Sequence, residues 1–256
     1  MRAVTLAPPE APEHRFAAAV AAAAGRALLD LRSDAGARGH WWIGSTGDRL
    51  AHELILGMIT EAFPDDAVRS EEGAVDAWGD GRLWIVDPLD GTHEFEVPGS
   101  AEWAVHVALV DGGVPVAGAV AVPALGEVLD TATAVPPGPA PGPPRLTVSR
   151  SHPPMIIRRV VHELGATVVP MGSAGAKVAA VVRGDADLYV HAGGQYEWDS
   201  AAPVAVALAA GLHASRLDGR PLRYGARDPW LPDLVVCRPE LADRVLAITS
   251  GMQGRR

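Results

Sequence analysis

Residues 84–92 read Trp-Ile-Val-Asp-Pro-Leu-Asp-Gly-Thr, and they place two carboxylates directly after an apolar run. The apolar residues 83–86 predict a buried strand. Because proline has no N–H to donate to a sheet ladder, Pro88 predicts that this strand stops near Asp87. The side chains of Asp87 and Asp90 would then project from a rigid strand end into a turn.

Fixed, closely spaced carboxylate oxygens are the ligands that a hard cation requires. Gly91 and Thr92 add backbone N–H groups and a hydroxyl, which suit an anion such as phosphate. Taken alone, however, an Asp-x-x-Asp pair is more often a turn or helix cap than a metal site. The stretch therefore indicates a site for a cation and a phosphate. Such a site needs further ligands from other parts of the chain.

The composition is that of a globular, acidic chain. Apolar residues make up 48% of the 256 residues, which is enough for a large core in one big domain or two smaller ones. Cys237 is the only cysteine, so no internal disulfide can form, which fits a reducing compartment. The net charge of −9 argues against a nucleic-acid polymer as partner and is compatible with an acidic metal-binding cluster.

The N-terminal region predicts neither a membrane span nor an export signal. Its longest apolar run, residues 16–24, is too short to cross a bilayer. Glu10 and Glu13 precede this run, where a signal peptide would carry basic residues. The sequence therefore predicts a cytoplasmic protein in which this run is the middle of an amphipathic helix.

Apolar periodicity, together with the positions of glycine and proline, predicts the order of helices and strands. In the first half we expect helices at 13–31 and 48–62 and strands at 67–69, 82–87, 103–110, 115–122 and 126–133. In the second half we expect strands at 145–149, 167–170, 187–191, 212–217 and 233–237, and helices at 154–164, 174–183, 199–211 and 239–249.

A proline-rich segment separates two differently organised halves. Residues 135–144 read Val-Pro-Pro-Gly-Pro-Ala-Pro-Gly-Pro-Pro, a composition that neither a helix nor a sheet interior tolerates. We therefore expect an α+β domain over 1–136 that contains an antiparallel sheet, a connector over 137–144, and an α/β domain over 145–256.

Four further segments could contribute to the same site, although each also has an ordinary structural interpretation. They are Glu71 in Ser70-Glu-Glu-Gly73, Asp199 before the small-residue run 200–210, Asp48 at the expected start of the second helix, and the small-residue turn 171–177. The glutamate could lie in a solvated loop, and the two aspartates could be helix caps. The small-residue turn offers N–H groups to an anion but lacks the spacing of a P-loop.

Taken together, these segments resemble the inositol monophosphatase superfamily of magnesium-dependent, lithium-sensitive phosphatases. The family's motifs occur in the family's order: Asp48 of its T-x-x-D element, with Ser45 in place of threonine; Glu71 of G-E-E, with Ser70 in place of glycine; Asp87-Pro-Leu-Asp-Gly-Thr92 as D-P-[IL]-D-G-T; Gly172-Ser-Ala-Gly175 as G-S-x-G; and Trp198-Asp-Ser-Ala-Ala202 as W-D-x-A-A. The resemblance covers nearly the whole chain and implies the layered αβαβα sugar-phosphatase fold.

Within the superfamily the chain is most similar to the CysQ-type branch, which acts on 3'-phosphoadenosine 5'-phosphate and is associated with sulfur assimilation. Glu94-Phe95, residues 191–199 and residues 215–224 carry this closer likeness. His93 departs from the Lys or Arg expected before Glu94. The alternatives are an inositol or fructose-bisphosphate phosphatase, a specialised nucleoside-pathway phosphatase, and an inactive ligand-binding regulator, which would have lost a ligand or the Thr–Asp pair.

The resemblance implies a role for each of the motif residues. The metal ligands would be Glu71, Asp87, Asp90, Asp199 and the carbonyl oxygen of Leu89, and they would hold two or three Mg²⁺ ions. Clustered carboxylates repel one another unless cations neutralise them, so a group of four carboxylates agrees with the bound Mg²⁺ ions that the resemblance implies. Thr92, oriented by Asp48, would position the attacking water, and the N–H groups of Gly91 and Thr92 would hold the phosphate.

The expected substrate is a bisphosphorylated adenosine or another small phosphomonoester, whose second phosphate needs cations away from the metals. Lys177, Arg216 and Arg223 are the candidates, although an arginine in such a position is more often a solvated surface residue. Ser173 could contact the sugar or base, and Tyr196 or Trp198 could pack near the adenine; Trp198 could also be a core residue. A homodimer is possible.

Overall fold

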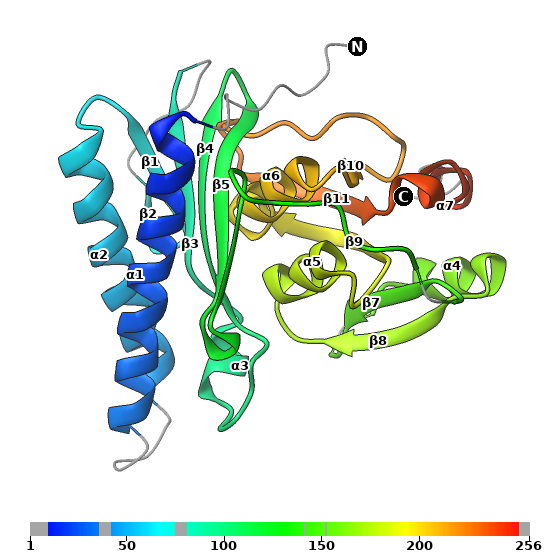
Figure 1. The fold of residues 1–256 in the computed structure, drawn as a ribbon, viewed down its shortest axis with the longest axis horizontal. Coiled ribbons are helices and arrows are strands. Elements are labelled where there is room, and N and C mark those ends of the chain that lie inside the picture. Colours follow the sequence, from blue (N-terminus) through cyan, green and yellow to red (C-terminus); the bar gives the residue numbers. More distant parts are fainter. Residues whose placement is uncertain (1–9, 36–41, 75–80, 141, 152, 251–256) are drawn as a thin grey trace.

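A computed structural model describes residues 10–35, 42–74, 81–140, 142–151 and 153–250. Its helices and sheets form five layers in the order helix, sheet, helix, sheet, helix (Figure 1). Helices α1 and α2 cover the outer face of the first sheet, and α5 and α6 lie between the two sheets. Helices α4 and α7 cover the outer face of the second sheet. The expected αβαβα class is therefore confirmed.

The first sheet is built from the N-terminal half in the order β2-β1-β3-β4-β5-β6. Its strands are β1 (Ala67–Ser70), β2 (Gly73–Ala74), β3 (Leu83–Asp90), β4 (Ala104–Asp111), β5 (Val114–Val122) and β6 (Glu127–Asp130). All neighbouring pairs are antiparallel except β1 and β3, which run parallel. The helices of this half are α1 (Pro12–Ala35), α2 (Ile43–Ala62), the short α3 (Thr92–Glu96) and the 3-10 turn η1 (Pro123–Leu125).

The second sheet is built from the C-terminal half in the order β10-β11-β9-β7-β8. Its strands are β7 (Arg145–Ser149), β8 (Thr167–Met171), β9 (Leu188–Tyr196), β10 (His213–Ser215) and β11 (Trp230–Cys237). Strand β7 runs parallel to β8 and β9, whereas β11 is antiparallel to β9 and β10. The helical segments are α4 (Ile156–Leu164), α5 (Ala174–Arg183), η2 (Glu197–Asp199), α6 (Ala201–Ala209), η3 (Pro239–Leu241) and α7 (Ala242–Thr249).

The prediction that the strand stops near Asp87 is wrong, because β3 continues through Pro88 to Asp90. The last pair between β1 and β3 joins Ser70 to Val86, so beyond that point β3 has a sheet partner only in β4. The register with β4 also shifts between Asp87 and Asp90. A proline is tolerated at such a one-sided, irregular position, where its missing N–H leaves no ladder bond unmade.

The second helix begins at Ile43, so the prediction that Asp48 opens it is wrong. Asp48 instead lies in the second turn and is buried. Helix α3 was not expected, and β9 and β11 are longer than expected because they pair from Tyr196 and Trp230 onward. The other expected elements are present with ends that differ by a few residues.

The central core draws on both halves of the chain. Ile85 of β3, Val178 of α5 and Leu234 of β11 belong to one buried apolar cluster. The division into domains at residues 137–144 therefore stays a prediction. None of the helices in the described part of the chain combines the length and apolar character that a membrane span requires.

A buried ion-pair cluster joins three strands of the second sheet. Asp187 is fully buried and accepts hydrogen bonds from the Arg145 side chain at 2.9 and 3.0 Å and from Arg238 Nε at 2.6 Å. It also accepts the backbone N–H of Arg145. Arg145 begins β7, Asp187 precedes β9, and Arg238 follows β11. The cluster therefore holds the beginnings of β7 and β9 next to the end of β11.

We expect Asp187→Asn to lower the free energy of unfolding by about 3 kcal/mol, because it leaves the buried Arg238 and the partly exposed Arg145 without their counter-charge. Urea unfolding monitored by circular dichroism measures this loss. The control is Asp185→Asn, since the Asp185 side chain is 63% exposed and should contribute less than about 1 kcal/mol. Equal losses in the two variants would contradict the prediction.

Candidate active site

Three aspartates from distant parts of the chain meet where the two sheets approach each other. Asp87 and Asp90 come from the end of β3, and Asp199 comes from η2, directly after β9. One carboxylate oxygen from each lies within 4.8 Å of the others. Asp87 and Asp90 are buried and Asp199 is half-buried. Oxygen ligands at this spacing are suited to a divalent cation.

Backbone N–H groups orient each of these carboxylates. Asp87 Oδ1 accepts the N–H of Leu89 at 3.1 Å, and Asp199 Oδ2 accepts that of Tyr196 at 2.7 Å. Asp90 accepts the N–H groups of Ala174 and Gly175. These two residues form the first turn of α5, whose N-terminal end carries a partial positive charge. The second half of the chain thus stabilises a carboxylate of the first.

Burial and mutual repulsion make the carboxylates hard to ionise together. Burial, and then the charges of Asp90 and Glu71, raise the pKa of Asp87 well above its ordinary value. Burial and Asp90 likewise raise the pKa of Asp199 to about 7. Burial also opposes ionisation of Asp90, but contacts with His106, the Gly175 N–H and Lys177 outweigh it and lower the pKa of Asp90.

Glu71 lies in the turn between β1 and β2, beside this cluster. The residue as a whole is exposed, but its carboxyl is partly buried and lies close enough to the carboxyls of Asp48 and Asp90 for their charges to affect it. Partial burial of the carboxyl, with repulsion from Asp48 and Asp90, raises the pKa of Glu71 to about 7. Carboxyls that repel one another in this way are stabilised by a bound cation, so Glu71 is placed to contribute to the same cation site.

Thr92 connects Asp48 to the end of β3. Its hydroxyl oxygen lies 3.4 Å from Asp48 Oδ2 and 3.2 Å from the carbonyl oxygen of Leu89. Burial, followed by the charge of Glu72, raises the pKa of Asp48 to about 7. Asp48 Oδ1 is buried without a hydrogen-bond partner, so the site retains an unsatisfied acceptor in addition to its crowded carboxylates. This donor set fits the divalent metal that the sequence predicts.

A cavity of about 380 Å³ opens beside Asp90 and Asp199. Segments from both halves line it, and they include Gly91, His93, Glu94, Ser149, Ser151, Gly172, Ser173, Ala174, Lys177, Tyr189, His191, Gly194 and Gln195. Its volume is in the range of small-molecule sites. Position 91 requires glycine, because its φ is +87° and a Cβ there would lie 2.8 Å from the Cβ of Ser173.

The structure brings some of the expected substrate contacts to this cavity. Lys177 is buried, and its Nζ donates to the carbonyl oxygen of Gly172 and lies 5.5 Å from the centre of the Tyr189 ring. Burial lowers the pKa of Lys177, against the opposing effect of Asp90. Ser173 caps α5 by accepting the N–H of Ala176 and still lines the cavity.

Other expected contacts lie elsewhere. Arg216 forms a bidentate ion pair with Asp233 at 2.7 and 2.9 Å, so its guanidinium is engaged away from the cavity. Arg223 lies near Gly113, in the β4–β5 hairpin, at the end of the first sheet opposite Asp90. The exposed Tyr196 is not among the lining residues and stacks on the ring of Trp198, with ring centres 4.7 Å apart.

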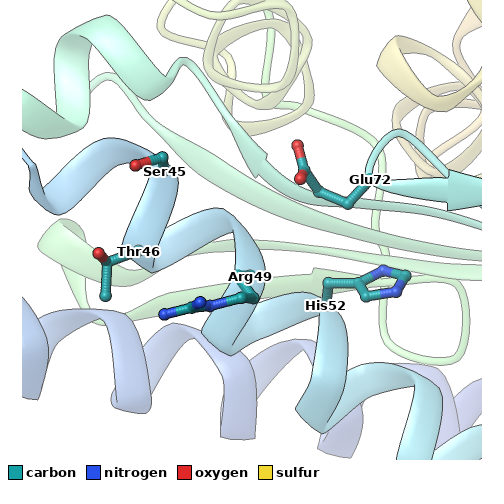
Figure 2. A pocket seen from close by; sticks show the side chains of 5 residues that line it. All are labelled: Ser45, Thr46, Arg49, His52 and Glu72. Atoms are coloured by element: carbon teal, nitrogen blue, oxygen red, sulfur yellow. The ribbon is translucent and has the colours of Figure 1, made fainter.

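Figure 2 shows a second cavity, of about 460 Å³, on the α2 side of the site. Ser45, Thr46, Arg49 and His52 lie along α2, and Glu72 faces them from the turn after β1. The charge of Glu72 contributes to the raised pKa of the neighbouring Asp48. This cavity therefore borders the site next to the Asp48–Thr92 pair.

Among the residues at the site that sequence reasoning did not identify are His106, Tyr189, His191 and Gln195. The last three lie on β9, the strand that leads to Asp199, and all three line the cavity. Tyr189 and His191 are two residues apart and so share one face of the strand, which was a usable signal. Gln195 follows an irregularity in the pairing of β9 with β11 and lies beyond the strand expected at 187–191. His106 is a single polar residue within the apolar strand β4, and that pattern alone does not distinguish a site residue from a core histidine.

Comparison with known proteins gives a consistent assignment. Residues 17–135 and 145–251 match the model of the inositol monophosphatase family. The chain is 49% identical over 235 residues to the 3'-phosphoadenosine 5'-phosphate phosphatase of Mycobacterium tuberculosis, covering 87% of this chain and 88% of the relative. It is 32% identical to the 3'(2'),5'-bisphosphate nucleotidase CysQ of Escherichia coli K12, with coverage of 73% and 81%. The crystal structure of CysQ from Bacteroides thetaiotaomicron superimposes with a TM-score of 0.75 at 29% identity, covering 89% and 97%.

We expect Asp199→Asn to stabilise the metal-free protein, and to do so more at about pH 8 than at about pH 5. The raised pKa means that wild-type Asp199 is protonated, and so resembles asparagine, below about 7. As the pH rises from the ordinary aspartate pKa toward about 7, the unfolded chain releases this proton while the folded protein keeps it, so wild-type stability is lost over this range, and above it Asp199 is ionised beside Asp90. Thermal unfolding in chelator at both pH values measures the difference. A variant that is less stable than the wild type at pH 8 would contradict the prediction.

Proposed function

The chain belongs to the inositol monophosphatase family and is a phosphatase, and we propose that it removes the 3'-phosphate of 3'-phosphoadenosine 5'-phosphate or of its sulfated precursor. The observation that carries the proposal is the meeting of Asp87, Asp90 and Asp199 beside a cavity of small-molecule size. The choice of substrate rests on relatives that are named for this activity and match most of the chain.

The family's metal dependence and the aspartate cluster support a divalent cation at this site. We propose Mg²⁺, as two or three ions, held by Glu71, Asp87, Asp90, Asp199 and the carbonyl oxygen of Leu89. Bound Mg²⁺ supplies positive charge that polarises the phosphate and offsets the charge developing on the leaving oxygen. The carboxylates contribute fixed positions, since backbone N–H groups already orient three of them.

Thr92 and Asp48 are proposed to hold the attacking water. If the Thr92 hydroxyl donates its proton to Asp48 Oδ2, its oxygen keeps lone pairs that can accept a hydrogen bond from water. The water's proton can then pass through Thr92 Oγ1 to Asp48. A pKa of about 7 suits Asp48 to accept a proton near neutral pH. The N–H groups of Gly91 and Thr92 are proposed to hold the phosphate.

Lys177 is the cation that we propose for substrate recognition, since it is the chain's only lysine and lines the cavity. Ser173 lines the same cavity and is proposed to contribute a polar contact to the sugar or base. Arg216, Arg223 and Tyr196 have no support from their positions as direct contacts. A cytoplasmic location and a homodimer stay predictions from the sequence.

A panel of phosphate esters tests the choice of substrate. We expect the kcat/KM for 3'-phosphoadenosine 5'-phosphate to exceed those for AMP, inositol 1-phosphate and fructose 1,6-bisphosphate by at least about tenfold, or about 1.4 kcal/mol of barrier. Phosphate release with Mg²⁺, and with chelator as the control, measures these values. Faster turnover of inositol 1-phosphate would reject the nucleotide assignment while leaving the phosphatase assignment intact.

Asp90→Asn tests the metal site. We expect Mg²⁺-dependent phosphate release to fall at least about a hundredfold, because the variant loses a charged ligand worth several kcal/mol to the transition state. Circular dichroism should show an unchanged fold, since asparagine can still accept an N–H group of α5. Asp185→Asn serves as the charge-matched control. Near-wild-type turnover by Asp90→Asn would eliminate the proposed metal site.

A further inference from the structure

We propose that His106 is a positioning residue that connects the metal ligands of the two halves of the chain and thereby sets the protein's affinity for its divalent cation. The inference rests on the metal site of the proposed function and concerns a residue that none of the family's motifs in this sequence contains. In this role the His106 side chain orients the metal ligands without binding the metal itself.

His106 occupies an unusual position for an imidazole. It is the third residue of β4, has no exposed surface, and lies between the buried apolar residues Val105 and Val107. In the sheet register its backbone is paired with that of Asp87. Burying a polar ring in an apolar strand is costly unless its nitrogens meet polar partners.

Both ring nitrogens face groups of the site. Nδ1 lies 3.0 Å from the carbonyl oxygen of Trp198, the residue directly before Asp199. Because a carbonyl oxygen only accepts, Nδ1 must carry the proton of this hydrogen bond. Nε2 lies 3.3 Å from Asp90 Oδ2, in a contact without the alignment of a full hydrogen bond. One side chain therefore touches the ligand at the end of β3 and the backbone that carries the ligand of η2.

The surroundings leave this ring little freedom. A Cβ on Gly175, in the first turn of α5, would lie 2.0 Å from His106 Nε2 and 2.9 Å from Asp90 Oδ2. The same Cβ would lie 3.0 Å from the Cβ of Ala104. The glycine thus lets α5 approach the His106–Asp90 contact closely, and the close packing holds the ring in place.

This geometry distinguishes a positioning role from plain packing. An apolar side chain of similar size could fill the space, but it would remove the donor that β4 offers to the Trp198 carbonyl. The segment that carries Asp199 would then lose this link to the strand next to Asp87 and Asp90. Partners that orient metal ligands commonly change metal affinity about 10–100-fold when they are removed.

The test compares His106→Leu with His106→Asn, two side chains of nearly the same shape. The Asn amide can place a donor near the position of Nδ1, whereas Leu cannot. Isothermal titration of the metal-free full-length protein with Mg²⁺ measures the dissociation constant without any turnover. We expect Leu to weaken binding about 10–100-fold and Asn to stay within about threefold of the wild type.

Circular dichroism in chelator checks that both variants are folded, and His106→Ala replaces the Leu variant if that one is not. Equal affinities of the donor-free and Asn variants, or a donor-free variant that binds as tightly as the wild type, would overturn the inference. Failure of the wild type to bind Mg²⁺ would instead overturn the proposed metal site, so the two failures are distinguishable.

Discussion

Repulsion among buried carboxylates is the constraint on which the rest of this structure depends. Asp87, Asp90 and Asp199 lie within 4.8 Å of one another, largely out of contact with water. Each ionisation opposes the next, so the protein has to surround the cluster with positive or donating groups. The first turn of α5, His106 and Lys177 supply these groups for Asp90. The remaining negative charge makes the site a cation site in a family of phosphatases.

The layered fold explains how these groups come together. Helix α5 lies between the sheets, and its N-terminal end points at the end of β3 (Figure 1). Strand β9 delivers Asp199 to the same place. A buried ion pair between Arg69 of β1 and Glu197 of η2, with Glu197 also accepting the N–H of Gly225, joins the halves again nearby. Contacts from α5, β9 and the Arg69–Glu197 ion pair therefore keep the acidic residues together despite the repulsion between their charges.

Much of the fold and most of the acidic residues at the site could be predicted from the sequence. The apolar run before Asp87, the small-residue helix after Asp199 and the turn before Lys177 are local patterns, and the structure places all three at the site. The errors arise from features that lie outside the local pattern. Pro88 did not end β3 because the neighbouring strand had already ended, and Asp48 did not begin a helix because α2 starts five residues earlier. Neither fact is visible in the residues themselves.

The sequence by itself determined the order of the acidic motifs along the chain and the reaction they point to, because these are carried by short stretches of residues. Only the tertiary structure decided which side chains face the cavity. Arg216 and Arg223 looked like phosphate ligands, but one is paired with Asp233 and the other lies at the far end of the sheet. His106 looked like an ordinary core residue, yet it contacts the cluster. Such assignments depend on contacts between residues far apart in the chain, and no local pattern encodes them.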